Sequence, residues 1–471
     1  MKKVIQNYFY NIGYQFVTLF VPFLTVPYIT RVMEPEYLGI EAYTFSIITI
    51  FIAFATAGTT IYAIRTIANL RSSKEEVSKV SYNLFLFRTI TTGFVFIILL
   101  FVSIKLNYQY FIYLQLFYFF ANTFFDCTWY FIGHERFKEI TLRNVIVKIL
   151  GFFLTILFVK DENDLYIYIL ITGLTILLPN IYFTWKFFRE IGRPHWDYFS
   201  LRYFKALINS LIPFFLMAII IQIYMNLDKL ILEYKGFTYE LGIYNQMIKT
   251  FLVFLGPLTA VGTVLLPYIS NLNKNKSKQN MENVIHLSSN IILLIGSPIF
   301  WGLLLISNQF VGTYFGPEFA KYQDLFKIGC LLILTGSIYN VIIQQVIFPN
   351  MLEKIYLKGL FFATLIRAFL LIILIDIFLL YAVLLAYVLS EVFVLVWCIS
   401  KTKNVVNLNA ILFNINNFKI FFAGFLMFLI LNLFDFNIFL TVLYGCLLYP
   451  AMLIVLKENL TRKLIKNKLI L

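Results

Sequence analysis

Stretches of about 20 largely apolar residues recur along the whole chain, and they constrain the fold more than any other feature. A helix needs about 20 such residues to cross roughly 30 Å of hydrocarbon. The stretches fall near residues 9–31, 41–64, 82–104, 108–132, 140–160, 164–187, 206–231, 241–268, 284–307, 323–347, 356–376, 378–400, 417–435 and 436–456. We therefore predict an all-α integral membrane protein with about 14 transmembrane helices.

The composition excludes a water-soluble fold. The chain is 61% hydrophobic and 13% charged, with a mean hydropathy of +0.83. Such a chain has too little polar surface to cover a soluble domain. Aromatic residues make up 19% of the chain, which is typical of lipid-facing helices with rings at the membrane interfaces.

The positions of lysine and arginine orient the predicted helices. If the N-terminus is cytoplasmic, 27 of the 38 Lys and Arg residues fall in cytoplasmic connections or in the two termini, and only six fall in outer connections. Cytoplasmic loops of membrane proteins carry such an excess. We predict that both termini are cytoplasmic. The net charge of +14 therefore reflects membrane orientation, because no stretch forms a basic nucleic-acid-binding face.

The chain lacks the motifs of common enzymes. No glycine-rich phosphate loop of the Walker type occurs, so ATP is not expected as the direct energy source. The cysteines lie within apolar stretches at unrelated spacings and the histidines lie in separate loops: Cys127, Cys330, Cys398 and Cys446, and His134, His195 and His286. We expect small buried cysteines, no cofactor, no metal site and no enzymatic activity.

A short pattern occurs twice, and it predicts duplicated halves. Glu36-Tyr37-Leu38-Gly39-Ile40 opens the second predicted helix, and Tyr239-Glu240-Leu241-Gly242-Ile243 opens the eighth. The same helices end in Ile67-Ala68-Asn69-Leu70 and Ile269-Ser270-Asn271-Leu272. Chance similarity between apolar segments is the alternative. Duplication predicts two six-helix bundles related by a pseudo-two-fold axis along the membrane normal, with lobes at 1–195 and 196–405 and helices 13 and 14 plus a cytoplasmic tail at 406–471.

The first 70 residues resemble a known family of transporters. The pattern runs from Asn7-Tyr8 through Pro27-Tyr28-Ile29-Thr30-Arg31-Val32 to Pro35-Glu36, Leu38-Gly39 and Tyr43, and Asn226-Leu227-Asp228-Lys229 is similar to the family's second half. It is similar to the opening of polysaccharide repeat-unit (O-antigen or capsule) flippases, often called Wzx proteins, of the multidrug/oligosaccharidyl-lipid/polysaccharide exporter superfamily. The chain departs from the family at Glu34, where most members carry Gly.

The resemblance implies an alternating-access carrier in the bacterial cytoplasmic membrane. Its expected substrate is an undecaprenyl-diphosphate-linked oligosaccharide, moved from the inner to the outer leaflet for surface polysaccharide biosynthesis. A polysaccharide polymerase and other assembly proteins are the expected partners. Two alternatives are a cation-coupled multidrug exporter of the same superfamily and a membrane polysaccharide polymerase or ligase. The exporter would need an acidic cavity, and the polymerase would need a sizeable outer loop that the chain lacks.

Ionisable residues inside the predicted helices are candidates for the substrate cavity. A charge at the bilayer centre costs about 2.5–3.5 kcal/mol on insertion scales and usually faces a cavity or a partner. The cations are Arg88, Lys148, Lys249, Lys327 and Arg367, and the anions are Asp126, Asp228 and Glu391. A positive balance suits a diphosphate and acidic sugars.

We expect five residues to line the cavity: Arg367, Lys249, Arg88, Asp228 and Arg31. Asp228 is a candidate partner for Lys249. Each cation has an alternative role. Side chains near helix ends, such as Arg88, can extend to the nearest interface, and Arg31 can cap a carbonyl group at the end of the first helix.

Prolines within the predicted helices mark candidate hinges. They are Pro22 and Pro27 in the first helix, Pro213 in the seventh, and Pro257 and Pro267 in the eighth. Each removes a backbone hydrogen bond and bends its helix. Bent helices beside the repeat axis would let two lobes rock between inward-open and outward-open states. The alternative is that prolines are simply frequent in transmembrane helices.

Overall fold

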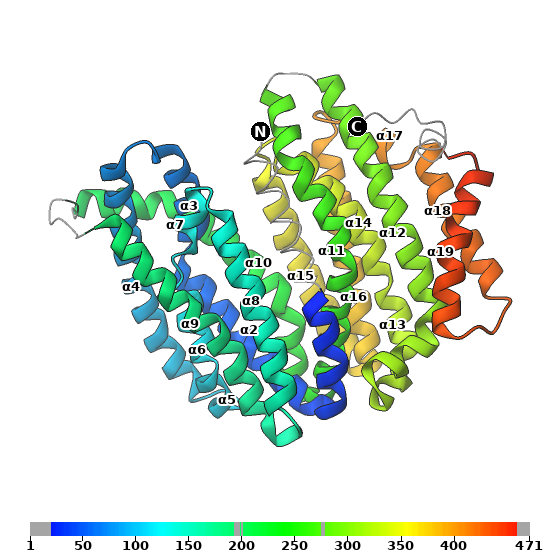
Figure 1. Ribbon diagram of the computed structural model, residues 1–471, viewed down its shortest axis with the longest axis horizontal. Coiled ribbons are helices and arrows are strands. Elements are labelled where there is room, and N and C mark those ends of the chain that lie inside the picture. The colour runs from blue at the N-terminus through cyan, green and yellow to red at the C-terminus, as the bar shows by residue number, and fades with distance from the viewer. Residues whose placement is uncertain (1–19, 193–197, 199–200, 275–277, 459–471) are drawn as a thin grey trace. The chain divides into compact units, whose positions relative to one another are not determined.

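The computed structural model describes residues 20–192, 198, 201–274 and 278–458, and every regular element among them is a helix (Figure 1). The chain divides into two compact units, Met1–Asn245 and Gln246–Leu471. Each unit is described below by itself. The sequence-based lobe boundaries at 195 and 405 stay predictions.

The first unit contains ten helices in its described part and the start of an eleventh. They are Phe20–Val32, α2 (Pro35–Thr56), α3 (Thr59–Leu70), α4 (Lys74–Ser103), α5 (Gln109–Leu114), α6 (Leu116–Asn122), α7 (Thr128–Gly133), α8 (Phe137–Phe158), α9 (Leu165–Ile191), α10 (Leu201–Tyr234) and the first turns of α11 (Thr238–Lys274). A short 3-10 turn, Glu162–Asp164, precedes α9. Glu34 precedes α2 with φ −62°, which any residue adopts, so this turn does not need the family's glycine.

The second unit begins within α11. Its further elements are α12 (Lys278–Phe315), a 3-10 helix (Pro317–Tyr322), α13 (Gln323–Gly329), α14 (Leu331–Ile342), a π-helical turn (Ile343–Ile347), α15 (Glu353–Phe378), α16 (Leu380–Thr402), α17 (Leu408–Leu412), α18 (Ile415–Leu431) and α19 (Ile438–Val455). Close packing joins α18 to α12, since Gly424 lies against the indole of Trp301 and a Cβ there would come within 2.6 Å of the ring.

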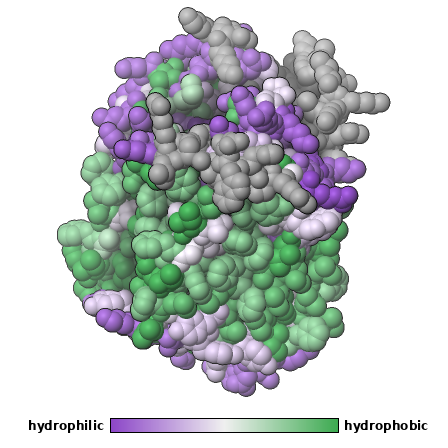
Figure 2. Space-filling view, turned by 90° about the vertical axis from the view of Figure 1, so that its left-hand side faces the viewer, coloured by the Kyte–Doolittle hydropathy of each residue, from purple (hydrophilic) through white to green (hydrophobic). Residues whose placement is uncertain are grey.

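The surface is that of a multi-pass membrane protein. Eleven of the described helices are long and apolar enough to cross a bilayer, and Phe20–Val32 and Ile415–Leu431 are shorter apolar helices. A broad hydrophobic band lies between hydrophilic margins in Figure 2. Side chains such as Phe101 and Ile372 are 69% and 64% exposed, as is typical of side chains that face lipid. The total of 14 spans and the cytoplasmic location of both termini stay predictions, because residues 1–19 and 459–471 lie outside the described part.

In the first unit, two stretches predicted as single helices are interrupted. The second, predicted at 41–64, is divided into α2 and α3 by Ala57 (φ +46°) and Gly58 (φ +73°). A glycine suits this position because a left-handed conformation costs other residues energy, and because a Cβ would lie 2.5 Å from the backbone nitrogen of Phe215. The fourth, predicted at 108–132, is divided into α5, α6 and α7. Hydropathy alone does not register either interruption.

The repeat is asymmetric in structure. Both copies of the repeated pattern open a helix, at the start of α2 and at the start of α11. The first copy is broken at Ala57 and Gly58, whereas α11 runs without interruption through its 37 residues. The helix break is therefore a property of the first half of the chain.

Candidate functional site

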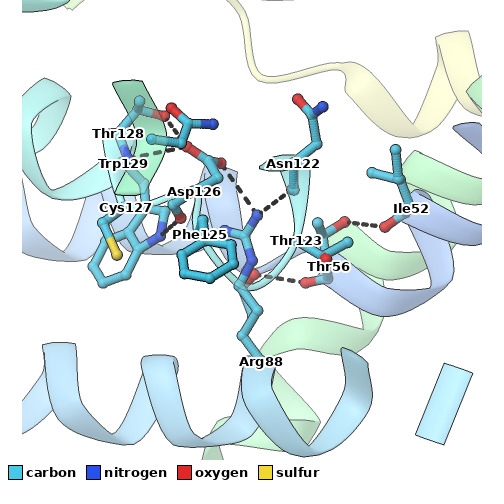
Figure 3. A network of polar contacts seen from close by, with 12 residues as sticks. Ile52, Thr56, Arg88, Asn122, Thr123, Phe125, Asp126, Cys127, Thr128 and Trp129 are labelled. Carbon is cyan, nitrogen blue, oxygen red and sulfur yellow. Dashed lines mark hydrogen bonds and ion pairs between the residues drawn. The ribbon is translucent and has the colours of Figure 1, made fainter. Parts of the chain in front are cut away.

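Arg88 lies inside the first unit and fills the interruption between α6 and α7 (Figure 3). Arg88 is 2% exposed. Nη2 donates to the carbonyl oxygen of Asn122 at 2.6 Å and to Oδ2 of Asp126 at 3.1 Å. The guanidinium therefore satisfies a backbone acceptor that the broken helix leaves without a partner, and it neutralises a carboxylate at membrane depth.

The other groups freed by this interruption are also paired. Asp126 accepts the backbone N–H of Thr128 through Oδ1 at 3.0 Å, and its carbonyl accepts Trp129 Nε1 at 2.9 Å. From α9, Asn180 Nδ2 donates to Ala121 O at 2.7 Å and Thr184 Oγ1 donates to Phe125 O at 2.7 Å. Side chains thus hold in place the end of α6 and the non-helical residues 123–127 that follow it.

Arg88 therefore does not extend to an interface, which was one of its two expected roles. Its charge is shared with Asp126, whose side chain is 16% exposed. Contact between Arg88 and a substrate stays a prediction. The pairing was not predicted from the sequence, because Arg88 and Asp126 lie 38 positions apart on different helices.

Arg367 is the central charged residue of the second unit. It lies midway along α15, is 1% exposed, and places its guanidinium carbon 3.9 Å from the centroid of the Tyr387 ring on α16. Glu391, one helical turn beyond Tyr387, interacts electrostatically with Tyr387 and with Tyr356. The hydroxyl of Tyr356 is hydrogen-bonded to that of Tyr339 on α14. One arginine, one glutamate and three tyrosines thus form a polar cluster, which we call the Arg367 cluster.

The remaining candidate residues lie in different settings. Asp228 is 2% exposed and accepts the Tyr244 hydroxyl. Arg31 is exposed and donates to Pro27 O at 2.5 Å, so it caps a carbonyl at the end of its helix. Lys249 lies on α11, half-buried, in the second unit. Lys327 pairs with Asp324 at 2.7 Å, which accounts for a lysine near the end of a predicted helix.

The candidate hinge prolines all fall within helices. Pro22 and Pro27 lie in Phe20–Val32, Pro213 lies in α10, and α11 runs through Pro257 and Pro267. Pro213 directly precedes the backbone of Phe214 and Phe215 that packs against Gly58. Bending at any of these prolines during transport stays a prediction.

The two copies of the repeated pattern lie against each other within the first unit. A Cβ on Gly39 would overlap the carbonyl oxygen of Thr238, and a Cβ on Gly242 would overlap that of Pro35. Each glycine thus opposes the carbonyl four residues before the other, so the crossing of α2 and α11 has local two-fold symmetry. Glu233, 4% exposed, fixes Thr238 by accepting its hydroxyl at 2.8 Å.

Three features of the site were absent from the sequence predictions. Tyr387 was not recognised because a tyrosine in an apolar helix carries no distinctive signal. Asn180 and Thr184 were also missed, although a polar residue in an apolar stretch often donates to a carbonyl group that lacks a helix partner.

Among the described residues, no three His, Cys, Asp or Glu side chains gather where they could hold a metal ion.

Comparison with known proteins decides the family. The model of the family described as "Polysaccharide biosynthesis protein" matches residues 4–273, more than half of the chain. The chain belongs to this family. A Shigella dysenteriae protein assigned as an O-antigen transporter is 22% identical over 347 residues, which cover 72% of this chain and 85% of that protein. The resemblance to repeat-unit flippases is confirmed by these matches.

Solved structures share the fold of this family member. The lipid II flippase MurJ, in an inward closed conformation, matches with a TM-score of 0.70 and 18% identity over 98% of this chain and 100% of that chain. An inward-facing multidrug resistance transporter of the MATE family, in the MOP superfamily, matches with a TM-score of 0.59 and 14% identity over 83% of this chain and 95% of that chain. At these identities the matches establish the fold alone.

Proposed function

We propose that the protein is a flippase that moves an undecaprenyl-diphosphate-linked oligosaccharide repeat unit from the inner to the outer leaflet of the bacterial cytoplasmic membrane. The family match over residues 4–273 is the observation that carries the proposal. The Shigella relative, assigned as an O-antigen transporter, and the fold shared with a lipid II flippase support the same substrate class.

The buried arginines suit this cargo. A lipid diphosphate loses hydration when it leaves the membrane surface, and a guanidinium offers donors that replace part of that hydration. Arg367 is held by a tyrosine ring on one face, which fixes the plane of its guanidinium. We propose that the Arg367 cluster contributes to the cargo path, together with Lys249, Asp228, Arg88 and Arg31.

We infer that transport proceeds by alternating access of two repeat-related lobes. The reciprocal crossing at Gly39 and Gly242 supports the duplication, because two copies of one pattern meet about a local two-fold axis. Backbones that touch directly, with no side chains between them, can separate and return to the same contact. The crossing is therefore suited to closing one end of the path.

Deletion of the gene tests the function. Lipid-linked repeat units should accumulate in membrane extracts, while the corresponding glycan should disappear from the cell surface. The wild-type gene supplied in trans should restore surface glycan. If the deletion strain displays normal glycan and encodes no second flippase, the proposal is wrong. If the repeat unit itself is not made, the protein acts before translocation.

A further inference from the structure

The helices of the first unit are weakened at one common level. At this level α2 and α3 are separated by Ala57 and Gly58, α6 and α7 are separated by residues 123–127, and α10 contains Pro213. α9 contains Pro179. Proline and interruptions of this kind remove helix hydrogen bonds and permit bending.

Direct contacts show that these weak points are adjacent. Thr91 of α4 donates from Oγ1 to Ala55 O at 2.6 Å, beside the α2/α3 break. One turn earlier, Arg88 donates to Asn122 and Asp126 in the α6/α7 break. Gly58 contacts the backbone of Phe214 and Phe215, directly after Pro213. We call the level defined by residues 57–58, 88–93, 121–127, 179–184 and 213–215 the hinge layer.

α4 crosses the hinge layer without interruption, but it carries Gly93 within two residues of Thr91. A Cβ on Gly93 would meet nothing within 4 Å, so packing does not require this glycine. A glycine inside a helix lowers its stability and stiffness relative to alanine. The helices α2/α3, α4, α6/α7, α9 and α10 therefore each have a point at the layer at which they can bend, whereas α8 reaches the layer near its start, where Arg143 donates to Asn180.

The residues on one side of the layer have a core of their own. It is formed by α3, residues 77–87 of α4, α7, residues 183–191 of α9 and residues 207–215 of α10. Aromatic rings fill it: Phe187 lies 5.4 Å from Trp129 and 5.2 Å from Tyr130, and Phe131 lies 4.9 Å from Phe183, between ring centroids. We call this body the α3–α7 module after two of its helices; α5 and α6 are not part of it. The labels of α3 and α7 lie together in Figure 1.

Ion pairs bind the ends of the module together. Arg71 pairs with Glu135 at 2.5 Å, and Arg136 pairs with Glu190 at 2.6 Å. At the hinge layer, by contrast, Arg88 leaves Nε and Nη1 without a hydrogen-bond partner among the described residues. Segments that share a core of their own open as cooperative units, and we expect the contacts of the hinge layer to exchange more readily than those within the module.

We propose that the α3–α7 module pivots on the hinge layer during the transport cycle, with Arg88 and Thr91 holding the breaks in the position seen here. This inference rests on the proposed function, and it adds a movement within one half of the protein. The module opens or closes its end of the cargo path without displacement of the whole first unit.

Gly93→Ala tests the pivot without damage to packing. The added methyl group fits in open space, so the melting temperature of the purified protein should stay equal or rise. Export of surface glycan should fall at least fivefold, because α4 is stiffened at the layer. Gly302→Ala in α12 is the matched control: this glycine is also inside a helix with nothing within 4 Å of its Cβ. Its export should stay within twofold of the wild type.

Distances between spin labels give a second measurement that needs no cargo. Cys446 is replaced by serine, and labels are placed on the purified full chain in lipid nanodiscs. The pair at Glu75, two residues before the α4 segment of the module, and Arg189, within the module, should give one narrow distribution. The pair at Glu75, near the start of α4, and Lys105, two residues after its end, should give a broad or double distribution that narrows in Gly93→Ala.

Wild-type export by Gly93→Ala would overturn the proposal, and so would a distribution across the layer as narrow as that within the module. Failure of the proposed function has a different signature, since a deletion strain that still displays its glycan leaves the spin-label result unaffected. The two ideas therefore fail separately.

Discussion

Arg367 has the most constrained charge among the candidate residues. Its guanidinium is buried and lies over a tyrosine ring, a contact that contributes about 2 kcal/mol when it is desolvated. The planar shape matters as well as the charge, because an ammonium group cannot lie flat on the ring and direct several donors at once.

Arg367→Met should lower export of surface glycan by tenfold or more at equal protein level in the membrane. Arg367→Lys should recover only part of the loss, because it restores charge without the planar contact. Surface glycan per cell, normalised to membrane protein by immunoblot, measures both. Lys327→Met is a suitable control, since Lys327 pairs with Asp324 near a helix end. Full export by Arg367→Met would remove Arg367 from the cargo path.

Arg88 and Asp126 should behave as a coupled pair. Removal of one partner from a buried ion pair costs about 3–5 kcal/mol, because the other charge is left buried. Arg88→Met should therefore lower the melting temperature strongly, and Asp126→Asn should do so less, since an amide oxygen can still accept from Thr128. The melting temperature of the double variant should fall by less than the sum of the decreases in the two single variants. Additive losses, measured by thermal unfolding of purified protein, would show that the two residues act independently.

At the scale of elements, the crossing of α2 and α11 depends on two glycines in equivalent positions. Gly39→Ala and Gly242→Ala should each push the helices apart, because the new methyl group overlaps a backbone oxygen that has no rotamer to change. Both should reduce export, and to a similar extent because the contact is reciprocal.

Comparison with Gly445→Ala separates this effect from a general intolerance of alanine. A Cβ on Gly445 would meet Met427 Sδ at 3.6 Å, an ordinary contact. Export by this control should match the wild type. If Gly39→Ala and Gly242→Ala also export normally, direct backbone contact between α2 and α11 is dispensable.

The long apolar helices were predictable, and their interruptions were not. Hydropathy averages over about 19 residues and located segments such as α4, α10 and α12 within a few positions of their cores. A break of two to five residues inside such a window leaves the average almost unchanged. Asn122, Asp126 and Thr128 carried a usable signal, because short polar side chains compete with helix hydrogen bonds.

The candidate site was predictable only as a set of costly charges. Arg88 and Arg367 were among the residues identified from the sequence, because a charge inside a transmembrane helix is costly. Their partners depend on which helices become neighbours, and that is decided by packing between segments far apart in the chain. The pair of repeated patterns is an exception: the sequence related Gly39 to Gly242, and the structure places both at one crossing.

At the scale of the whole molecule, charge alone predicts the orientation in the membrane, and this prediction is open to a direct measurement. Ser72→Cys lies in the connection between α3 and α4, and Asn163→Cys lies between α8 and α9. In intact cells a membrane-impermeant maleimide should label the second position and not the first until the membrane is permeabilised. Labelling of the protein without an introduced cysteine measures the background from its native cysteines. The opposite pattern would reverse the predicted orientation.

The interruption at residues 123–127 has a consequence for biogenesis. The translocon releases segments into lipid according to their apolarity, and Asp126 alone adds about 2.5–3.5 kcal/mol to that partition. α5, α6 and α7 are each too short to cross the bilayer alone, whereas α4 is a 30-residue apolar helix that leaves the ribosome first and carries Arg88. We expect the segment that contains α5, α6 and α7 to leave the translocon only together with α4. The two would then enter the lipid as a hairpin in which Arg88 already neutralises Asp126.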